Sequence, residues 1–359
     1  MRISQILIKE TAFPLKVPFI TAIRMVDQVQ VLHVSIETEA GIRGLGAASP
    51  TAAITGETAS SIREAVCLIG DGLIGRETGD LNALLDQVGR SLPGNTSARA
   101  ALDMALHDLV SREMNLPLTR LLGGGFREMT TDLTISLRDK ELMVKDAVDA
   151  ERAGLGVLKI KLGREWEEDF RRFKAVSGAV SCLLRIDANQ GWSVKETLRF
   201  MDRCDRDNLE VDLLEQPVRA DDLQGMAFIR SRILCPLAAD EAVFSPSDAL
   251  RVIETGSADI INIKLLKSGG IYQARKIAAL AESAGLEGMI GCMMESPVGI
   301  AAAVHFAAAT PWIRYFDLDV PLLLRDFSSD YGIVCEGPQI QPSETPGLGS
   351  GGTEEEWIK

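Results

Sequence analysis

Residues 157–163 read VLKIKLG, an apolar run with a charge near its end at Lys161. Four later runs of the same kind also end in a charged residue, and the intervals between the five charged residues are 26, 28, 25 and 24 positions. Each interval accommodates one strand, one helix and two loops, which is the repeat of an α/β barrel whose strands direct side chains into a common opening. The later runs are LLRID ending at Asp187, VDLLE at Glu215, PLAAD at Asp240 and DIINIK at Lys264.

Three further β-rich runs bring the number of expected strands to eight, which is the number that closes such a barrel. Amphipathic segments separate the runs, as the helices of a barrel would. The periodicity ends after Leu324, so we predict that the barrel domain covers residues 126–324. The additional runs are TDLTISL at 131–137, GLEGMIGCMM at 285–294 and WIRYFDLDV at 312–320.

The residues before the barrel have a different pattern. Two stretches, 3–13 and 29–41, alternate apolar and polar residues with a period of two, which indicates an antiparallel sheet. Helical spacing follows, and the long stretch ARAALDMALHDLVSREM begins after the cap-like sequence NTS at 95–97. A sheet followed by helices predicts an α+β domain over residues 1–125, and we expect the Gly/Pro-rich tail, 325–359, to return to it.

The composition excludes several classes of protein. The chain has 38 basic and 51 acidic residues, and its net charge of −13 argues against nucleic acid or an anionic membrane as a partner. The six cysteines are scattered without a CxxC pair, so neither a zinc site nor a disulfide framework is indicated. Charges at Lys9 and Glu10 interrupt the apolar stretch that a signal peptide needs. We expect a cytoplasmic protein that forms a homo-oligomer.

Lysines occupy two positions of the same predicted strand. Lys159 and Lys161 are two residues apart and therefore face the same side, which we expect to be the barrel interior. Burial and a neighbouring positive charge both lower the pKa of a lysine, so Lys161 is a candidate base near neutral pH. The alternative is a pair of surface lysines on an edge strand. Lys264 lies on the sixth predicted strand, across the barrel from Lys161 on the second.

Asp187, Glu215 and Asp240 each follow an apolar run, where an unpaired carboxylate is costly to bury. Any one of them could be a salt-bridge partner or a helix cap. Together they form an oxygen-only set of ligands, which favours Mg²⁺, or Mn²⁺, over zinc. With a lysine on either side, this arrangement suits a 1,1-proton transfer, in which one lysine removes an α-proton and the other returns a proton from the opposite face.

The motifs KxK, DAN, EQP, ADE and NIKxxKxGG, in this order, resemble the muconate-lactonising subgroup of the enolase superfamily, and the resemblance covers essentially the whole chain. It implies an α/β fold: a modified TIM barrel, (β/α)7β, with an α+β capping domain formed by the N-terminal segment and the C-terminal tail. It also implies that Lys161 and Lys264 are the acid/base pair and that Asp187, Glu215 and Asp240 bind Mg²⁺. A mandelate-racemase-type member would have a histidine in place of Lys264, whereas His33, His107 and His305 are predicted to be structural.

Asp317 and Asp319 form a D-x-D pair at the end of the eighth predicted strand, similar to a signature of dipeptide epimerases that binds a free α-ammonium group. A solvated pair at the barrel rim is the alternative. In L-Ala-D/L-Glu epimerases an arginine in the position of Arg24 meets the side-chain carboxylate of the substrate, although Arg24 could equally clamp the capping domain. The other residues expected to shape the substrate pocket are Lys159, Thr134, Ser136, Ile54, Thr55, Met293, Met294 and Glu295.

From these features we predict an Mg²⁺-dependent dipeptide epimerase that inverts the α-carbon of the C-terminal residue, with L-Ala-D/L-Glu from murein peptides as the expected substrate. Three alternatives remain. The first is a dipeptide epimerase of hydrophobic or cationic specificity. The second is an o-succinylbenzoate synthase or muconate cycloisomerase, against which the D-x-D pair argues. The third is a barrel that binds peptides without catalysis, although such a chain would be expected to have lost a lysine or a metal ligand.

Overall fold

The computed structural model describes residues 1–21, 25–328 and 330–349. Its first sheet is antiparallel and has the order β1-β2-β3, as the period-two stretches predicted. Gly44 and Gly46 of β3 allow this strand to lie directly on α3: a Cβ atom would lie 2.1 Å from the Ala105 carbonyl oxygen at Gly44 and 1.9 Å from that of Ala101 at Gly46. The elements are β1 (Ile3–Ile20), β2 (Met25–Thr38), β3 (Arg43–Ala48), α1 (Ala59–Asp71), α2 (Leu81–Ser91), α3 (Thr96–Glu113) and α4 (Leu118–Leu121).

Helix α3 begins at the position expected from NTS, but its capping group is a different residue. Asn95 occupies the N-cap position in a left-handed conformation, and its side chain donates to the Pro93 carbonyl instead of capping the helix. The carboxylate of Glu57 accepts hydrogen bonds from the backbone N–H groups of Ser97 (2.9 Å) and Ala98 (3.2 Å). A buried carboxylate from another loop therefore satisfies the first N–H groups of α3.

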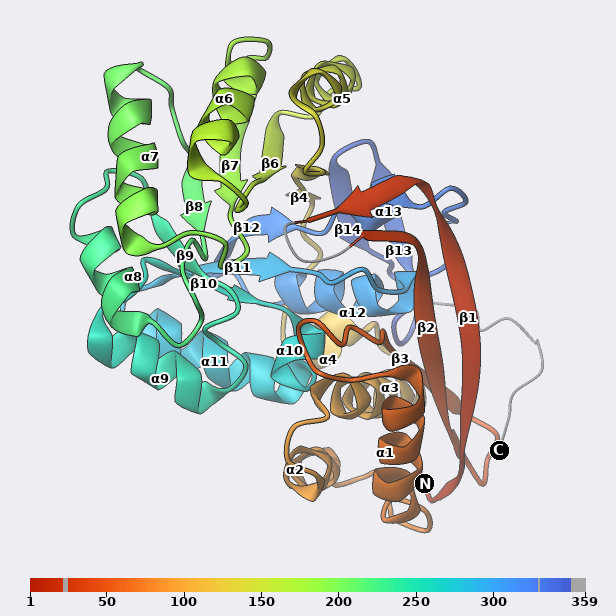
Figure 1. Cartoon of the computed structure of the whole chain (residues 1–359). Helices are drawn as coiled ribbons and strands as arrows, with labels where there is room; N and C mark the ends of the chain where they lie inside the picture. The colour runs from red at the N-terminus through yellow and green to blue at the C-terminus, as the bar shows by residue number, and fades with distance from the viewer. Residues whose placement is uncertain (22–24, 329, 350–359) are drawn as a thin grey trace.

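The second sheet contains eight parallel strands in sequential order from β5 to β12, as predicted from the eight β-rich runs. Seven main helices, α5 to α9, α11 and α12, cover its outer face (Figure 1). The strands are β5 (Leu133–Ile135), β6 (Val157–Lys161), β7 (Leu183–Asp187), β8 (Leu213–Glu215), β9 (Leu237–Ala239), β10 (Ile260–Ile263), β11 (Glu287–Gly291) and β12 (Ile313–Asp317). The helices are α5 (Lys140–Arg152), α6 (Trp166–Ser177), α7 (Val194–Arg206), α8 (Leu223–Arg230), α9 (Pro246–Thr255), α10 (Leu265–Ser268), α11 (Ile271–Ser283), α12 (Pro297–Ala308) and α13 (Val320–Leu323).

The barrel is nearly closed between its last and first strands, where the backbone N–H of Asp132 donates to the Phe316 carbonyl at 3.1 Å. Only the four-residue helix α13 follows β12, so no full-length eighth helix covers this seam in the described part of the chain. The second half of β1 lies beside α13 there instead (Figure 1). The Arg325 N–H donates to the Pro14 carbonyl at 2.9 Å, and Leu15 forms an isolated bridge with Leu324. The predicted (β/α)7β barrel is thus confirmed.

The C-terminal tail contacts both parts of the molecule. Its strands β13 (Ile333–Glu336) and β14 (Gln339–Pro342) form a small antiparallel sheet with β4 (Met129–Thr130), next to the barrel. Further along the tail, the Leu348 N–H donates to the buried carboxylate of Asp108 on α3 at 2.6 Å. Within the described ranges, no helix combines the length and the apolar character needed to cross a membrane.

Candidate active site

Three carboxylates meet at the carboxyl ends of neighbouring barrel strands. The parallel register pairs Lys161 with Asp187 and Asp187 with Glu215, so these side chains leave the sheet at one level. Asp240 follows β9 directly. Oxygens of Asp187, Glu215 and Asp240 all lie within 4.8 Å of one another, and the three residues are at most 2% exposed. The structure therefore brings together the predicted metal ligands.

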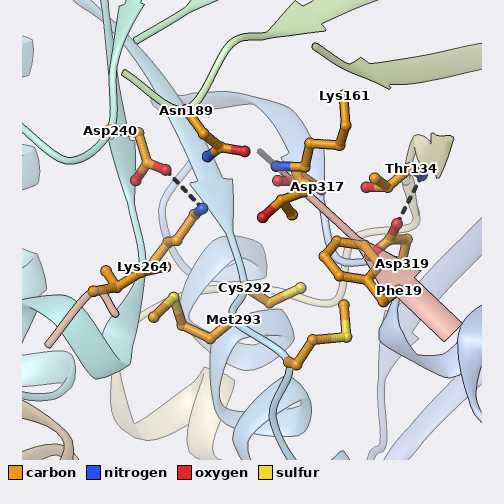
Figure 2. Close-up of a pocket in the computed structure, with 13 residues that line it drawn as sticks. Phe19, Thr134, Lys161, Asn189, Asp240, Lys264, Cys292, Met293, Asp317 and Asp319 are labelled. Atoms are coloured by element: carbon orange, nitrogen blue, oxygen red, sulfur yellow. Dashed lines mark hydrogen bonds and ion pairs between the residues drawn. The ribbon is translucent and has the colours of Figure 1, made fainter. Parts of the chain in front are cut away.

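The two candidate acid/base lysines approach this cluster from different sides. Lys161 Nζ lies 2.5 Å from Asp187 Oδ2, and Lys264 Nζ lies 2.8 Å from Asp240 Oδ2. Lys161 belongs to β6 and Lys264 follows β10, so three strands separate them. Figure 2 shows both side chains reaching toward the centre of the pocket. The arrangement leaves a position between two ammonium groups that lie next to the carboxylate cluster.

Lys159 lies beneath the pocket. Its Nζ contacts Glu215 Oε2 at 2.7 Å, Asp317 Oδ2 at 2.8 Å and Asp187 Oδ2 at 3.1 Å, and it is 1% exposed. It therefore bridges the proposed metal ligands to the D-x-D pair and does not line the pocket. Lys161 is also buried, so the alternative of surface lysines is wrong.

The pKa values of Lys159 and Lys264 are raised, opposite to the direction that burial alone gives. Burial lowers the pKa of Lys159, but Asp317, Glu215 and Asp187 outweigh it and hold that pKa well above its usual value. For Lys264 burial is likewise outweighed, chiefly by Asp240, and its pKa is also raised. Around these two lysines the charge of the neighbouring carboxylates therefore outweighs the effect of burial.

Negative charge is in excess around the opening. Among the described residues that form this network, seven buried carboxyl groups face five buried cations. Burial, together with the neighbouring carboxylates, raises the pKa of Glu215 to about 8, of Glu241 to about 7 and of Asp319 to about 6. The carboxyls are Asp132, Asp187, Glu215, Asp240, Glu241, Asp317 and Asp319, and the cations are Lys159, Lys161, Arg185, Lys264 and Lys267.

This excess and the donor set together fit a hard divalent cation. The cluster of Asp187, Glu215 and Asp240 offers only carboxylate oxygens, which are the ligands that Mg²⁺ prefers. Buried carboxylates at this separation repel one another, and a divalent cation would relieve the repulsion. A positively charged substrate group would reduce the remaining excess.

The D-x-D pair lies on the other side of the pocket. Asp317 is bound by Lys159, whereas Asp319 Oδ2 accepts a hydrogen bond from the Thr134 backbone N–H at 2.8 Å. Both aspartates are buried, so the alternative of a solvated pair at the rim is wrong. Asp132 joins them, with its carboxylate oxygen within 4.8 Å of theirs, and is held by Arg185 at 2.8 Å. Sequence reasoning missed Asp132, although it lies two residues before Thr134, directly ahead of β5.

The predicted pocket residues divide into two groups. Thr134, Ile54, Met293 and Met294 line the pocket, together with Phe19, Thr21 and Cys292, which sequence reasoning did not identify (Figure 2). Three others lie elsewhere: Ser136 accepts from the Ile20 N–H, Thr55 donates to the Thr51 carbonyl, and Glu295 accepts from the Met293 N–H. Arg24 lies outside the described residues.

Several supporting residues come from the motifs themselves. The backbone N–H of Asn189, from DAN, donates to Asp187 Oδ1 at 2.9 Å, and Lys267, from NIKxxKxGG, lies 2.5 Å from Asp240 Oδ1. The motif spacing could have identified both as residues that orient the carboxylates. His107, in contrast, does not line the pocket, and its Nδ1 lies 3.1 Å from Asp103 Oδ1 within α3.

Comparison with known proteins gives consistent matches along the chain. The family of mandelate racemase/muconate lactonizing enzyme N-terminal domains matches residues 3–123, and the enolase C-terminal domain-like family matches residues 142–356. The L-Ala-D/L-Glu epimerase of Clostridium acetobutylicum is 42% identical over 97% of this chain and 98% of its own length. The hydrophobic dipeptide epimerase of Enterococcus faecalis is 36% identical over 97% of this chain and 99% of its own length.

Two solved structures are similar throughout. One is a substrate-liganded complex of the L-Ala-D/L-Glu epimerase from Bacillus subtilis, with a TM-score of 0.94 and 40% identity over 97% of this chain and 98% of that one. The other is the dipeptide epimerase from Enterococcus faecalis with Mg and L-Leu-L-Tyr, with a TM-score of 0.92 and 35% identity over 97% of this chain and 99% of that one.

Proposed function

We propose that this chain, which belongs to the mandelate racemase/muconate lactonizing enzyme family of the enolase superfamily, epimerises dipeptides of the L-Ala-D/L-Glu type derived from murein peptides. It is an isomerase, an Mg²⁺-dependent dipeptide epimerase: L-Ala-D/L-Glu epimerases and a hydrophobic dipeptide epimerase match it over nearly the whole chain, and the Enterococcus faecalis structure contains Mg and a dipeptide. The observation that carries the proposal is the placement of two buried lysines on different sides of one carboxylate cluster, with a buried D-x-D pair nearby.

Asp187, Glu215 and Asp240 are the residues that would hold Mg²⁺. When bound, the cation supplies positive charge to the carboxylate of the substrate and so lowers the cost of removing the neighbouring α-proton. Neighbouring lysines fix the positions of two of these carboxylates: Lys159 and Lys161 contact Asp187, and Lys264 and Lys267 contact Asp240.

Lys161 and Lys264 are the proposed acid and base. An α-carbon between the two Nζ atoms can lose its proton to one lysine and receive a proton from the other on the opposite face, which inverts its configuration. In either direction the accepting lysine must be neutral and the donating lysine charged. The ion pairs with Asp187 and Asp240 keep both Nζ atoms directed at the pocket.

Asp319, with Asp317 beside it, is the proposed binding site for the α-ammonium group of the substrate. A dipeptide with its C-terminal carboxylate at the carboxylate cluster would then extend toward Thr134 and Asp319. In this orientation the substrate ammonium group would pair with the buried carboxylate of Asp319, which also accepts the hydrogen bond from the Thr134 N–H. A cycloisomerase or an o-succinylbenzoate synthase would process a substrate without an amine and would have no use for the pair.

The preference for glutamate at the second position is supported by the L-Ala-D/L-Glu epimerases of Clostridium acetobutylicum and Bacillus subtilis, which are 42% and 41% identical to this chain. One observation favours a second candidate, a hydrophobic dipeptide epimerase: Ile54, Met293 and Met294 give the pocket an apolar wall.

α-Proton exchange in D₂O with Mg²⁺, followed by mass spectrometry, tests the function and decides between these specificities. Deuterium in L-Ala-L-Glu supports the glutamate specificity. Exchange confined to dipeptides with apolar second residues would support the second candidate. No exchange in any dipeptide would contradict the proposed function.

We also propose a cytoplasmic homo-oligomer in which domains 1–125 and 126–324 meet at the active site and residues 325–359 return to the first. The free state of all six cysteines supports a reducing compartment. The break between the two family matches, after residue 123 and before residue 142, supports the first domain boundary. Light scattering after gel filtration would measure the mass of the protein in solution, and a monomer at micromolar concentration would contradict the proposed homo-oligomer.

A further inference from the structure

A second cavity lies next to the active-site pocket and shares Phe19 and Thr134 with it. Its volume is about 210 Å³, compared with about 40 Å³ for the pocket itself. Since a site for one water requires about 10–15 Å³ on this scale, the pocket has little spare room, whereas the neighbouring cavity has room for a side chain of several carbon atoms.

The position of this cavity follows from the missing eighth helix. At the seam between β12 and β5, an extended segment of β1 takes the place of a helix, and a single strand fills less of the space between the sheet and the surrounding helices. Leu15, Val17 and Phe19 of β1 form one wall of the cavity. Leu133 and Ile135, which alternate with Thr134 along β5, form the facing wall.

The cavity begins at the residue that holds the proposed ammonium site. The Thr134 backbone N–H donates to Asp319 Oδ2 at 2.8 Å, and Thr134 contributes to the lining of both spaces. In a dipeptide, the first side chain leaves the same α-carbon that carries the ammonium group. A substrate bound through Asp319 therefore has its first side chain within a few bonds of the cavity entrance at Phe19 and Thr134, which lie close to Asp319 in Figure 2.

The chemistry of the walls indicates which side chains would fit. Apart from Thr134 and Ser136, the polar residues of the cavity are Arg138, Asp146 and Asp149, which are already paired: Arg138 with Asp146, and Asp149 with Lys145 at 3.3 Å. Among the described residues Arg138 keeps a buried Nε–H without an acceptor, but Asp146 balances its charge, so an acidic substrate side chain would meet no uncompensated cation here. The remaining walls are apolar.

We infer that the cavity between β1, β5 and α5 is the subsite for the side chain of the N-terminal residue of the substrate, and that it accommodates aliphatic side chains larger than the methyl group of alanine as well as alanine itself. The inference rests on the proposed function. It assigns the specificity for the first residue to the seam of the barrel, and it leaves the choice of the second residue to the pocket between the two lysines.

The test measures kcat/KM for epimerisation of two dipeptide series, L-Xaa-L-Glu and L-Xaa-L-Leu, with Ala, Leu or Met as the first residue. Ala150, on the cavity wall, is 6% exposed, and the substitution Ala150→Leu would fill the cavity. Val17→Phe does the same from β1, at a position that is 50% exposed and therefore tolerant of a larger side chain. Ala153→Leu, at the exposed end of α5, is the matched control.

In either filling variant, the ratio of kcat/KM for Leu-first over Ala-first substrates is expected to fall by about 10-fold or more, because one methylene in an apolar subsite is already worth about 10-fold. Ala-first substrates and the control should change by less than about 2-fold. An unchanged ratio in a folded filling variant would overturn the inference and leave the epimerase function intact. Absence of epimerisation in both series of the wild-type enzyme would instead overturn the proposed function, and the subsite with it.

Discussion

The substitution Asp319→Asn tests the recognition of the substrate ammonium group. Asn has the same shape as Asp, and its side-chain oxygen can still accept the hydrogen bond from the Thr134 N–H that fixes Asp319 at 2.8 Å. Asp317 keeps its contact with Lys159. The change therefore removes one negative charge from a residue that is 2% exposed and leaves the rest of the network in place.

The expected magnitude follows from that burial. A hydrogen bond that involves a charged group contributes about 1.5–3 kcal/mol when solvent does not screen it. Since about 1.4 kcal/mol corresponds to a factor of ten, KM for L-Ala-L-Glu should rise by about 10- to 100-fold. The α-carbon chemistry belongs to Lys161 and Lys264, so kcat should change by only about 2- to 3-fold.

The assay compares L-Ala-L-Glu with N-propionyl-L-Glu, which has the same outline without the ammonium group. Wild-type enzyme should discriminate against the propionyl compound, and Asp319→Asn should lose most of that discrimination, as a double-mutant cycle between enzyme and substrate would show. Asp71→Asn, at the exposed end of α1, controls for the loss of an acidic charge. An unchanged KM, or an equal rise in KM for both compounds, would refute the role of Asp319 in ammonium recognition.

Three further predictions concern the lysines, the capping of α3 and a buried carboxyl group. Lys161→Ala and Lys264→Ala should each lower epimerisation by about 10²–10⁴-fold, while each variant still exchanges the α-proton of one enantiomer in D₂O; near-normal turnover in either variant would exclude the two-base mechanism. Glu57→Ala should lower the free energy of unfolding by about 1–3 kcal/mol in urea titrations, because buried N–H groups at the start of α3 lose their acceptor. Burial raises the pKa of Glu295 from 4.5 to about 7, so the folded protein keeps a proton that the unfolded chain loses, and stability falls as pH rises from about 4.5 to about 7. The shift corresponds to about 3 kcal/mol, and Glu295→Gln should therefore gain thermal stability relative to wild type between pH 5 and pH 8; a difference in Tm that does not change with pH would contradict this.

The sequence was sufficient to predict the features that depend on local periodicity. The period-two stretches produce the β1–β2 hairpin, and the nearly constant spacing of charged strand ends produces the barrel. Because parallel strands in sequential order align their carboxyl ends, the same spacing places Lys161, Asp187 and Glu215 side by side. The sequence could therefore predict which charged side chains meet at the carboxyl ends of the strands, because strand order determines those neighbours.

Features that depend on distant groups were not predictable in this way. Glu57 caps a helix that begins about forty residues later, and no short-range pattern connects the two. The pKa of Lys159 depends on Asp187, Glu215 and Asp317, which come from three different strands. In both cases the outcome is decided by charges that meet only after folding, and motif spacing specifies the strand of each residue but not the balance of charge around it.

The seam of the barrel, between β12 and β5, combines a feature that local periodicity predicts with contacts between distant parts of the chain. A chain with seven main helices around eight strands must cover one inter-strand groove with something else, and here the N-terminal hairpin does so. The segment that covers the groove also carries Phe19 into the pocket, so one strand of the capping sheet closes the barrel and also borders the site where Asp319 would bind the substrate. Substitutions at Leu15 or Val17 could then change the choice of the first residue without contact with either lysine or any of the proposed metal ligands. Specificity for the first residue and the chemistry would consequently be separable in this enzyme, because β1 comes from the beginning of the chain, whereas the lysines and the proposed metal ligands lie in or directly after the central strands β6 to β10.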